Sequence, residues 1–329
     1  MSEPLLVVEN LRKLFSAKKP GLFRRDGQYI HAVDGVSFSI DRGEILALVG
    51  ESGCGKSTLA LTLMGLEQST EGRIIFQGED ITRLEGDRAK ELRRRVQMVF
   101  QDPYESLNPT QTIYEIVAEP LQVHHLLKDR VEQEARVIQA LEDAGLKPAA
   151  DFFHRYPHEL SGGQRQRVVI AGALVLDPIL LLADEPVSML DVSIRAEILN
   201  LLQDLRNTRG ISILFITHDL GTVAYFADRI GVMYLGRMVE LGRTEEVLRM
   251  PQHPYTRALL SVVPVPNPRL RRERTILQGE TPNPIDLPAG CRFHPRCPLA
   301  FDRCKQVEPL LVQVNESHQA ACLLLQGEN

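Results

Sequence analysis

The stretch GESGCGKST, Gly50 to Thr58, stands between the apolar run ILALV and the segment TLALTLMGL, whose spacing is helical. This order of strand, glycine-rich turn and helix is the context that a phosphate-binding loop requires. In such a loop the glycines let backbone amides close around phosphates, Lys56 reaches the β and γ phosphates, and the Ser57 hydroxyl binds Mg²⁺. We therefore predict a nucleotide site that begins here. Its residues are Gly50, Glu51, Ser52, Gly53, Cys54, Gly55, Lys56, Ser57 and Thr58.

The stretch ILLLADEP, Ile179 to Pro186, is a continuous apolar run followed by two carboxylates. At the carboxyl end of a buried parallel strand, Asp184 is placed to hold Mg²⁺, usually through water, and Glu185 to polarise an attacking water. Alone, such a run could simply cap a strand. Downstream of a phosphate-binding loop, it predicts a site that hydrolyses a nucleotide.

The wider sequence predicts an α/β fold, a P-loop NTPase core with a mostly parallel sheet, because short apolar runs alternate with helical stretches. Helical segments interrupt this core after Gln101 and predict a helical subdomain at about 102–175 within a nucleotide-binding domain of residues 1–250. The predicted strands are 5–11, 45–49, 74–76, 179–183 and 211–216. The predicted helices are 113–127, 131–144 and 195–206.

Composition and charge limit the location and the partners. The 329 residues carry a formal net charge of −5, which argues against a nucleic-acid partner because such proteins usually present a strongly basic domain or face. The arginine runs 93–95 and 269–274 are interpreted as solvated surface. The N-terminus lacks the pattern of a secretory signal, and no run of about 18 apolar residues offers a membrane span. These features predict a cytosolic protein with reduced thiols.

The C-terminal region has an unusual composition. Of the 20 prolines, 11 lie from Pro251 onward, which predicts a separate, irregular extension over residues 251–329. Four of the five cysteines lie there with the spacing C-x5-C-x6-C-x17-C, which leaves the identity of a metal open. Several thiolates in a segment with a small hydrophobic core suggest a structural metal site that stabilises the segment. His294 and His318 could compete as ligands but are interpreted as surface residues.

The stretch LSGGQRQRVVIAGAL, Leu160 to Leu174, predicts a second anion site. Ser161 is a natural N-cap, and the glycines after it expose amides at the positive end of a helix dipole. A second cradle about a hundred residues after the first would be redundant for one nucleotide. We therefore expect this stretch to contact a nucleotide that is bound to another subunit.

These motifs, together with Gln101 in VFQDP, the turn SMLDVS and His218 in ITHD, resemble the ATP-binding subunit of an ABC transporter over residues 5–250. The resemblance implies a head-to-tail dimer in which each ATP lies between one subunit's phosphate loop and the other's signature residues. These are Ser161, Gly162, Gly163 and Gln164. It also implies that Gln101 joins the Mg²⁺ site and couples it to the membrane partner, that Asp191 crosses the dimer interface, and that His218 contacts the γ-phosphate.

Some positions within the resemblance need separate interpretation. Cys54 occupies a position that the loop pattern leaves free, and we expect it to act as a small filler. Met189 replaces the small residue that the family more often has, and we expect it to adjust packing. The aromatic that stacks on adenine is expected near LRKLF, where the chain inserts SAKKPGLFRRDGQYIH just afterwards. Phe15 is the first choice and Tyr29 the second.

Two further stretches, QDPYESLNP and HPYTRALLSVVPVPNP, are similar to the peptide-import branch of the family. This implies an ATP-hydrolysing subunit that powers import of dipeptides, oligopeptides or a related solute such as nickel, at the cytoplasmic face of a bacterial or archaeal membrane. The implied partners are two permease subunits, a separate solute-binding protein and a second ATP-binding subunit, since GLFRRDG resembles the second of two paired ATPases.

The cysteine-rich end of the chain is also similar to that branch. The resemblance implies a [4Fe-4S] cluster, with Zn²⁺ as the alternative, and a structural role for the bound group. The implied ligands are Cys291, Cys297, Cys304 and Cys322.

Two other functions remain to be weighed. A soluble ABC ATPase of translation or DNA repair usually carries two cassettes in one chain, whereas this sequence has one cassette and no basic face. A regulatory subunit that binds ATP without hydrolysis typically loses a catalytic or signature residue. This chain keeps Lys56, Ser161, Glu185 and His218, although the site formed with a partner could still be asymmetric. The direction of transport rests on the resemblance, because ATPase chemistry sets no direction.

Overall fold

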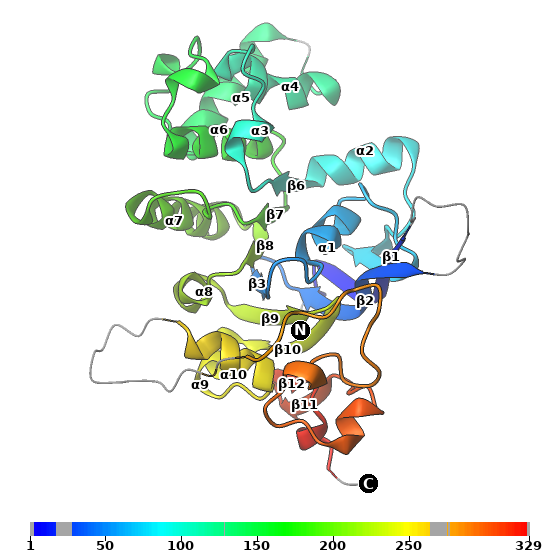
Figure 1. The fold of residues 1–329 in the computed structure, drawn as a ribbon. Helices are drawn as coiled ribbons and strands as arrows, with labels where there is room; N and C mark the ends of the chain where they lie inside the picture. The colour runs from blue at the N-terminus through cyan, green and yellow to red at the C-terminus, as the bar shows by residue number, and fades with distance from the viewer. Residues whose placement is uncertain (1–2, 18–27, 128, 264–274, 276, 328–329) are drawn as a thin grey trace, which may run out of the picture. The chain divides into compact units, whose positions relative to one another are not determined.

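The computed structural model describes residues 3–17, 28–127, 129–263, 275 and 277–327, and the chain divides into two compact units. Unit 1 comprises Met1–Ile40, Leu46–Arg83 and Thr217–Asn329, and unit 2 comprises Asp41–Ile45 and Leu84–Ile216. Figure 1 labels their elements. The stretch GLFRRDG and the arginine run 269–274 lie outside the described residues.

Unit 1 contains a four-stranded antiparallel sheet in the order β2-β1-β4-β5. The predicted strands at 5–11 and 74–76 are confirmed within β1 and β4. This antiparallel sheet is additional to the mostly parallel sheet that the sequence predicts. Its β4–β5 pair is joined by a two-residue turn at Gln77 and Gly78, and such hairpins give antiparallel pairs. The strands are β1 (Leu6–Ser16), β2 (Tyr29–Ile40), β4 (Glu71–Phe76) and β5 (Glu79–Asp80).

Five further strands of unit 1 follow the order β11-β12-β10-β9-β3. The predicted strand at 45–49 is β3, and it pairs in parallel with β9. The remaining pairs are antiparallel. These strands are β3 (Ile45–Val49), β9 (Arg229–Tyr234), β10 (Arg237–Arg243), β11 (Val312–Asn315) and β12 (His318–Ala320). The helices of unit 1 are α1 (Lys56–Leu63), α8 (Leu220–Phe226), α9 (Thr244–Arg249) and α10 (Pro254–Ser261).

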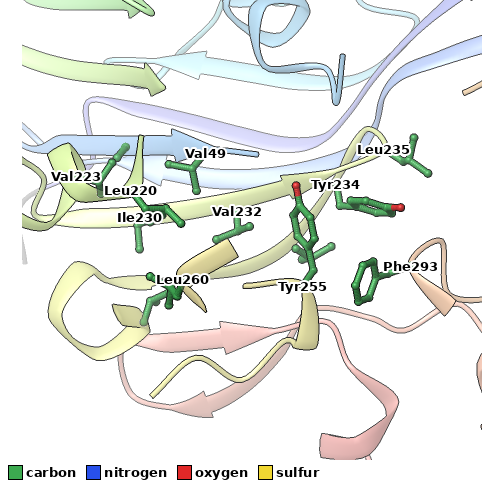
Figure 2. Close-up of a cluster of buried hydrophobic side chains, with 13 residues drawn as sticks. Val49, Leu220, Val223, Ile230, Val232, Tyr234, Leu235, Tyr255, Leu260 and Phe293 are labelled. Atoms are coloured by element: carbon green, nitrogen blue, oxygen red, sulfur yellow. The ribbon is translucent and has the colours of Figure 1, made fainter. Parts of the chain in front are cut away.

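The C-terminal extension belongs to unit 1, and its boundary at residue 251 stays a prediction. Its strand β12 pairs with β10, where Ala320 lies opposite Glu240. Its Phe293 is 1% exposed and packs with Tyr234 and Tyr255 in a hydrophobic cluster that Figure 2 shows. The proline count predicted an irregular backbone, which is correct for most of residues 277–327, but irregular backbone can still bury apolar side chains.

Unit 2 carries parallel strands in the order β8-β7-β6, as the alternating pattern predicts. The strands are β6 (Val96–Val99), β7 (Leu180–Asp184) and β8 (Ser212–Thr217). The helices are α2 (Gly86–Arg95), α3 (Pro103–Ser106), α4 (Ile113–Val123), α5 (Arg130–Asp143), α6 (Gly162–Leu174) and α7 (Val192–Arg209). All three predicted helices exist, with shifted ends.

Local capping explains where these helices begin and end. Thr112 and Glu115 form a capping box that starts α4, and the helix stops four residues before the predicted end because His125 has a left-handed backbone with a φ of 51°. Gly210 ends α7 in the same conformation. Among the described residues, none of the helices combines the length and apolarity needed to span a bilayer.

Candidate nucleotide-binding site

The phosphate loop connects β3 to α1 and needs glycine at two positions. A Cβ atom on Gly50 would lie 2.3 Å from the carbonyl oxygen of Met233, and one on Gly55 would lie 1.9 Å from that of Ala32. Gly55 also has a φ of 106°, which is costly for any residue with a side chain. The loop is thus held against the neighbouring backbone with no room for a side chain at either position.

Lys56 lies at the centre of the loop. Its ammonium donates to the carbonyl oxygens of Gly50, at 2.8 Å, and Glu51, at 3.0 Å, and the residue is 5% exposed. Phosphate oxygens are acceptors of the same kind, so this lysine can donate to a bound phosphate. Cys54 is buried beneath the loop with its sulfur 3.7 Å from the ammonium, and burial raises the pKa of its thiol. A buried neutral thiol fits the expected role as a small filler.

The solvent side of the loop is open. Ser52, Gly53 and Ser57 are exposed, and Ser57 lies in the first turn of α1. Its hydroxyl is therefore accessible to a ligand at the N-terminus of the helix, where a phosphate is also favoured. Thr58 follows in the same turn and is partly buried.

The two candidate adenine-binding aromatics lie at one end of the β1–β2 pair. Phe15 is opposite Ile30, and Tyr29 is opposite Ser16. Tyr29 is 47% exposed, and the Lys13 ammonium lies 4.6 Å from the centre of the Phe15 ring. Because β2 also supplies the carbonyl that touches Gly55, this strand links the aromatic pair to the phosphate loop. The choice of Phe15 over Tyr29 stays a prediction.

The predicted catalytic carboxylates, Asp184 and Glu185, lie at the carboxyl end of β7 in unit 2. Asp184 is the last residue of β7 and is 7% exposed, and Glu185 follows it with a φ of 48°. The amide Nε2 of Gln101, which follows β6, lies 3.2 Å from Oε2 of Glu185. The structure therefore brings Gln101 and Glu185 together, as parallel neighbouring strands require. A left-handed conformation at a non-glycine residue is a strain that functional sites often retain.

His218 is exposed just beyond the carboxyl end of β8. Its side chain is accessible to a ligand, and its expected contact with the γ-phosphate stays a prediction.

The signature residues form the start of α6. The Ser161 hydroxyl accepts from the backbone N–H of Gln164 at 3.3 Å, and Oε1 of Gln164 accepts from the N–H of Ser161 at 3.0 Å. The expected N-cap is confirmed as a complete capping box. A Cβ atom on Gly163 would lie 2.5 Å from Ile194, so the helix packs closely on α7 at this point. Gly162 and Gln164 are partly buried beside the exposed Ser161.

Two residues beside the signature were not found from the sequence. The guanidinium of Arg165 lies 4.2 Å from the ring centre of Tyr104, and the Tyr104 hydroxyl would lie 4.0 Å from a Cβ atom on Gly162. The segment after Gln101 therefore contacts the signature helix. An aromatic and an arginine 61 positions apart give no local pattern that would reveal this contact.

The turn before α7 presents an exposed, partly apolar surface. Asp191 is exposed, and its neighbours Met189 and Val192 are 58% and 80% exposed. Two large apolar side chains therefore lie in solvent on either side of Leu190 and Asp191. Met189 thus points its side chain to solvent in the single chain.

The four C-terminal cysteines are free thiols in one electrostatic neighbourhood. The N–H of Cys291 donates to the carbonyl of Cys304 at 2.8 Å. Burial raises the pKa of Cys291 to about 11, and the charges of the other three cysteines add to that rise. Within the described part of the chain, no three His, Cys, Asp or Glu side chains are arranged to hold a metal ion. The metal site therefore stays a prediction.

His318 corrects one interpretation of the extension. It is 1% exposed, and its Nε2 lies 2.7 Å from Oε1 of Glu240, which is fully buried. It is an internal residue rather than a surface one. His294 is partly buried, with Nδ1 2.9 Å from the carbonyl oxygen of Cys291.

The comparisons with known proteins identify the family of this chain. Residues 33–188 match the family described as ABC transporter, and residues 239–304 match the family described as oligopeptide/dipeptide transporter, C-terminal region. The chain is 48% identical to the oligopeptide transport ATP-binding protein AppF of Bacillus subtilis, over 98% of each chain. The chain belongs to the family of ATP-binding subunits of peptide ABC transporters. It is therefore an ABC-type ATPase with the P-loop fold that its motifs predict.

Two further relatives of this ABC ATPase are informative. The dipeptide transport ATP-binding protein DppF of Haemophilus influenzae is 48% identical over 97% of this chain and 96% of its own. A solved structure of the ATP-binding cassette MJ0796, described as dimeric and in a post-hydrolysis state bound to ADP and Pi, matches with a TM-score of 0.63 and 29% identity. That match covers 73% of this chain and 98% of the cassette.

Proposed function

We propose that this ABC ATPase powers the import of dipeptides or oligopeptides through a membrane transporter. The observation that carries the proposal is the similarity to AppF and DppF over nearly the whole chain, including the extension. An ATP-binding subunit of this kind takes ATP as its own substrate, and the choice of solute lies with other subunits. Transport assays therefore decide which solute is carried: a dipeptide, an oligopeptide or a related solute such as nickel.

The residues of the site suggest how hydrolysis proceeds. Lys56 and the loop amides bind the phosphates, and Ser57, Gln101 and Asp184 are the candidates to hold Mg²⁺, which neutralises phosphate charge when bound. Glu185 accepts the proton of the attacking water as general base, and the Gln101 amide fixes the orientation of that carboxylate. His218 is placed beyond β8 to contact the γ-phosphate.

The active form in this proposal is a dimer that encloses ATP between subunits. The exposed Ser161 cap and the exposed turn around Asp191 support this arrangement, because one chain leaves both open to a partner. The dimer described for MJ0796 is in line with it. We propose a second ATP-binding subunit as the partner, together with two permeases and a solute-binding protein, at the cytoplasmic face of the membrane.

The test is transport-coupled hydrolysis in the assembled complex. The chain is co-purified with its permeases from membranes, placed in liposomes, and assayed for ATP hydrolysis with the solute-binding protein and labelled dipeptide, oligopeptide or nickel. We expect peptide to stimulate hydrolysis and to accumulate in the liposomes. Co-purification with ribosomes or DNA, without permeases, would support the soluble alternative instead.

We also propose that the four C-terminal cysteines bind a metal group, with an iron–sulfur cluster ahead of zinc. Four reduced thiols that share one neighbourhood suit thiolate ligation, and a bound group would staple an extension of irregular backbone. The ligands would be Cys291, Cys297, Cys304 and Cys322. Absorbance of the anaerobically purified protein, with iron, sulfide and zinc assays, tests this. Zinc without iron would refute the cluster, and no metal at all would refute the site.

A further inference from the structure

The second residue of the phosphate loop, Glu51, is held by the C-terminal extension. Nη1 and Nη2 of Arg296 donate to its two carboxylate oxygens at 2.7 and 3.1 Å, so the ion pair is bidentate. The Thr281 hydroxyl donates to the same carboxylate at 2.7 Å. The backbone N–H of Glu51 donates to the Tyr255 hydroxyl at 2.9 Å. Both the side chain and the backbone of this loop residue are therefore fixed by residues more than 200 positions away.

The groups that hold Glu51 are themselves fixed in a packed aromatic cluster. Tyr255 is 0% exposed, and its ring centre lies 4.7 Å from that of Tyr234 and 5.4 Å from that of Phe293. Figure 2 shows these three rings grouped at one side of the hydrophobic cluster. The Arg296 guanidinium lies 5.9 Å from the Tyr234 ring centre. A guanidinium beside packed rings loses little freedom when it binds a carboxylate, so the pair is preorganised.

The electrostatics of the pair favour the charged form of Glu51. Burial by itself would raise the pKa of Glu51, but the hydrogen bonds from Arg296 and Thr281 and the charges of Arg296 and Lys56 outweigh it, and the pKa is lowered. The Arg296 side chain is 9% exposed, so solvent screens it weakly. Removal of either partner would leave a poorly solvated charge next to the loop.

The backbone of Glu51 connects this ion pair to the lysine of the loop. Its carbonyl oxygen, with that of Gly50, accepts from the ammonium of Lys56. A shift of Glu51 would therefore shift the acceptors that now orient Lys56. We propose that Arg296 is a positioning residue for ATP: through Glu51, the C-terminal extension sets the conformation of the phosphate loop and so the affinity for nucleotide.

The experiment measures ATP and ADP dissociation constants of the full-length purified chain by titration, together with its melting temperature. We expect Arg296→Gln to weaken ATP binding roughly tenfold, the factor that corresponds to one charge-assisted hydrogen bond. Arg296→Lys keeps the positive charge but lacks the paired N–H donors of the guanidinium, so it should recover part of the affinity for ATP. The matched control is Arg303→Gln, because Arg303 lies in the same extension and donates to the carbonyl of Gly327. That variant should bind ATP like the wild type.

A second measurement separates positioning from a loss of folding. Hydrogen exchange of the amides at 50–57 should rise in Arg296→Gln while exchange in α4 and α5 stays unchanged. Thr281→Val removes one neutral donor to Glu51 and should weaken ATP binding in the same direction, even if Arg296→Gln does not fold. The inference rests on ATP binding by the loop, which the wild-type chain tests in the same titration. Wild-type affinity in both Arg296→Gln and Thr281→Val would overturn it.

Discussion

Gln101 donates its side-chain amide to Glu185 over 3.2 Å, although 84 positions separate them in the chain. The contact exists because Gln101 follows β6 and Glu185 follows β7, and these strands are parallel neighbours. A carboxylate held by an amide is kept in one orientation without being neutralised, which suits a base that must face a water molecule.

The substitution Glu185→Gln keeps the size of this side chain and removes its basicity. We expect ATP binding to be unchanged and turnover in the assembled complex to fall by about 10²- to 10⁴-fold, the usual contribution of a general base. Binding is measured by nucleotide titration and turnover by phosphate release. Glu134→Gln, an exposed glutamate on α5, is the control and should retain full turnover. Unchanged turnover in Glu185→Gln would refute the assignment.

The sequence was informative where function depends on local pattern. The phosphate loop, the Ser161 cap and the two carboxylates at the carboxyl end of β7 are each encoded within about ten residues, and each has the predicted local structure. The role of Arg296 was missed because it pairs with a residue 245 positions away, and no periodicity marks such a pair. The same holds for His318, which is interpreted from the sequence as a surface residue but which β12 brings against the buried Glu240. Contacts between residues far apart in the chain depend on the order of strands in the sheet, and the residue pattern within one segment does not specify that order.

The glycine at position 55 offers a test of the close backbone packing beneath the loop. We expect Gly55→Ala to lower stability by more than about 2 kcal/mol and to abolish ATP binding, because its Cβ atom would overlap the carbonyl of Ala32. Gly210→Ala is a control with a left-handed backbone and no atoms within 4 Å of the added Cβ. It should cost about 1 kcal/mol and leave ATP binding intact. Equal decreases in the free energy of unfolding of Gly55→Ala and Gly210→Ala, measured by denaturant unfolding, would contradict the packing argument.

Ser161 combines a capping role with a proposed contact to a partner's ATP, and the two can be separated. Ser161→Ala should lower stability by about 1 kcal/mol through loss of the cap and should also abolish turnover of the dimer. Ser161→Asp keeps a capping acceptor, so it should restore stability while turnover stays lost, since a carboxylate repels phosphate. Thr112→Ala removes the equivalent capping box of α4 and should lower stability alone. Normal turnover in Ser161→Asp would show that the hydroxyl has no part in hydrolysis.

His253, one of the buried histidines of the extension, predicts how the free energy of unfolding depends on pH. His253 is 1% exposed, its Nδ1 accepts from the N–H of Tyr255 at 3.1 Å, and burial lowers its pKa to about 4. The charged groups that act on it are Glu240, which raises the pKa, and Arg257, which lowers it. The folded state binds a proton at His253 less readily than the unfolded state does. The contribution of neutral His253 to the free energy of unfolding is therefore complete above about pH 6.5 and is lost as the pH falls toward 4.

We therefore expect the free energy of unfolding to fall by up to roughly 3 kcal/mol between pH 6.5 and 4 on account of His253. His253→Asn keeps a capping acceptor for α10 and removes the titrating ring, so its stability should depend less steeply on pH over this range. The measurement is urea unfolding at several pH values for both proteins, because m-values reveal whether the transition remains cooperative. Parallel curves would assign the acid sensitivity to other groups, since Asn cannot bind the proton that His253 excludes.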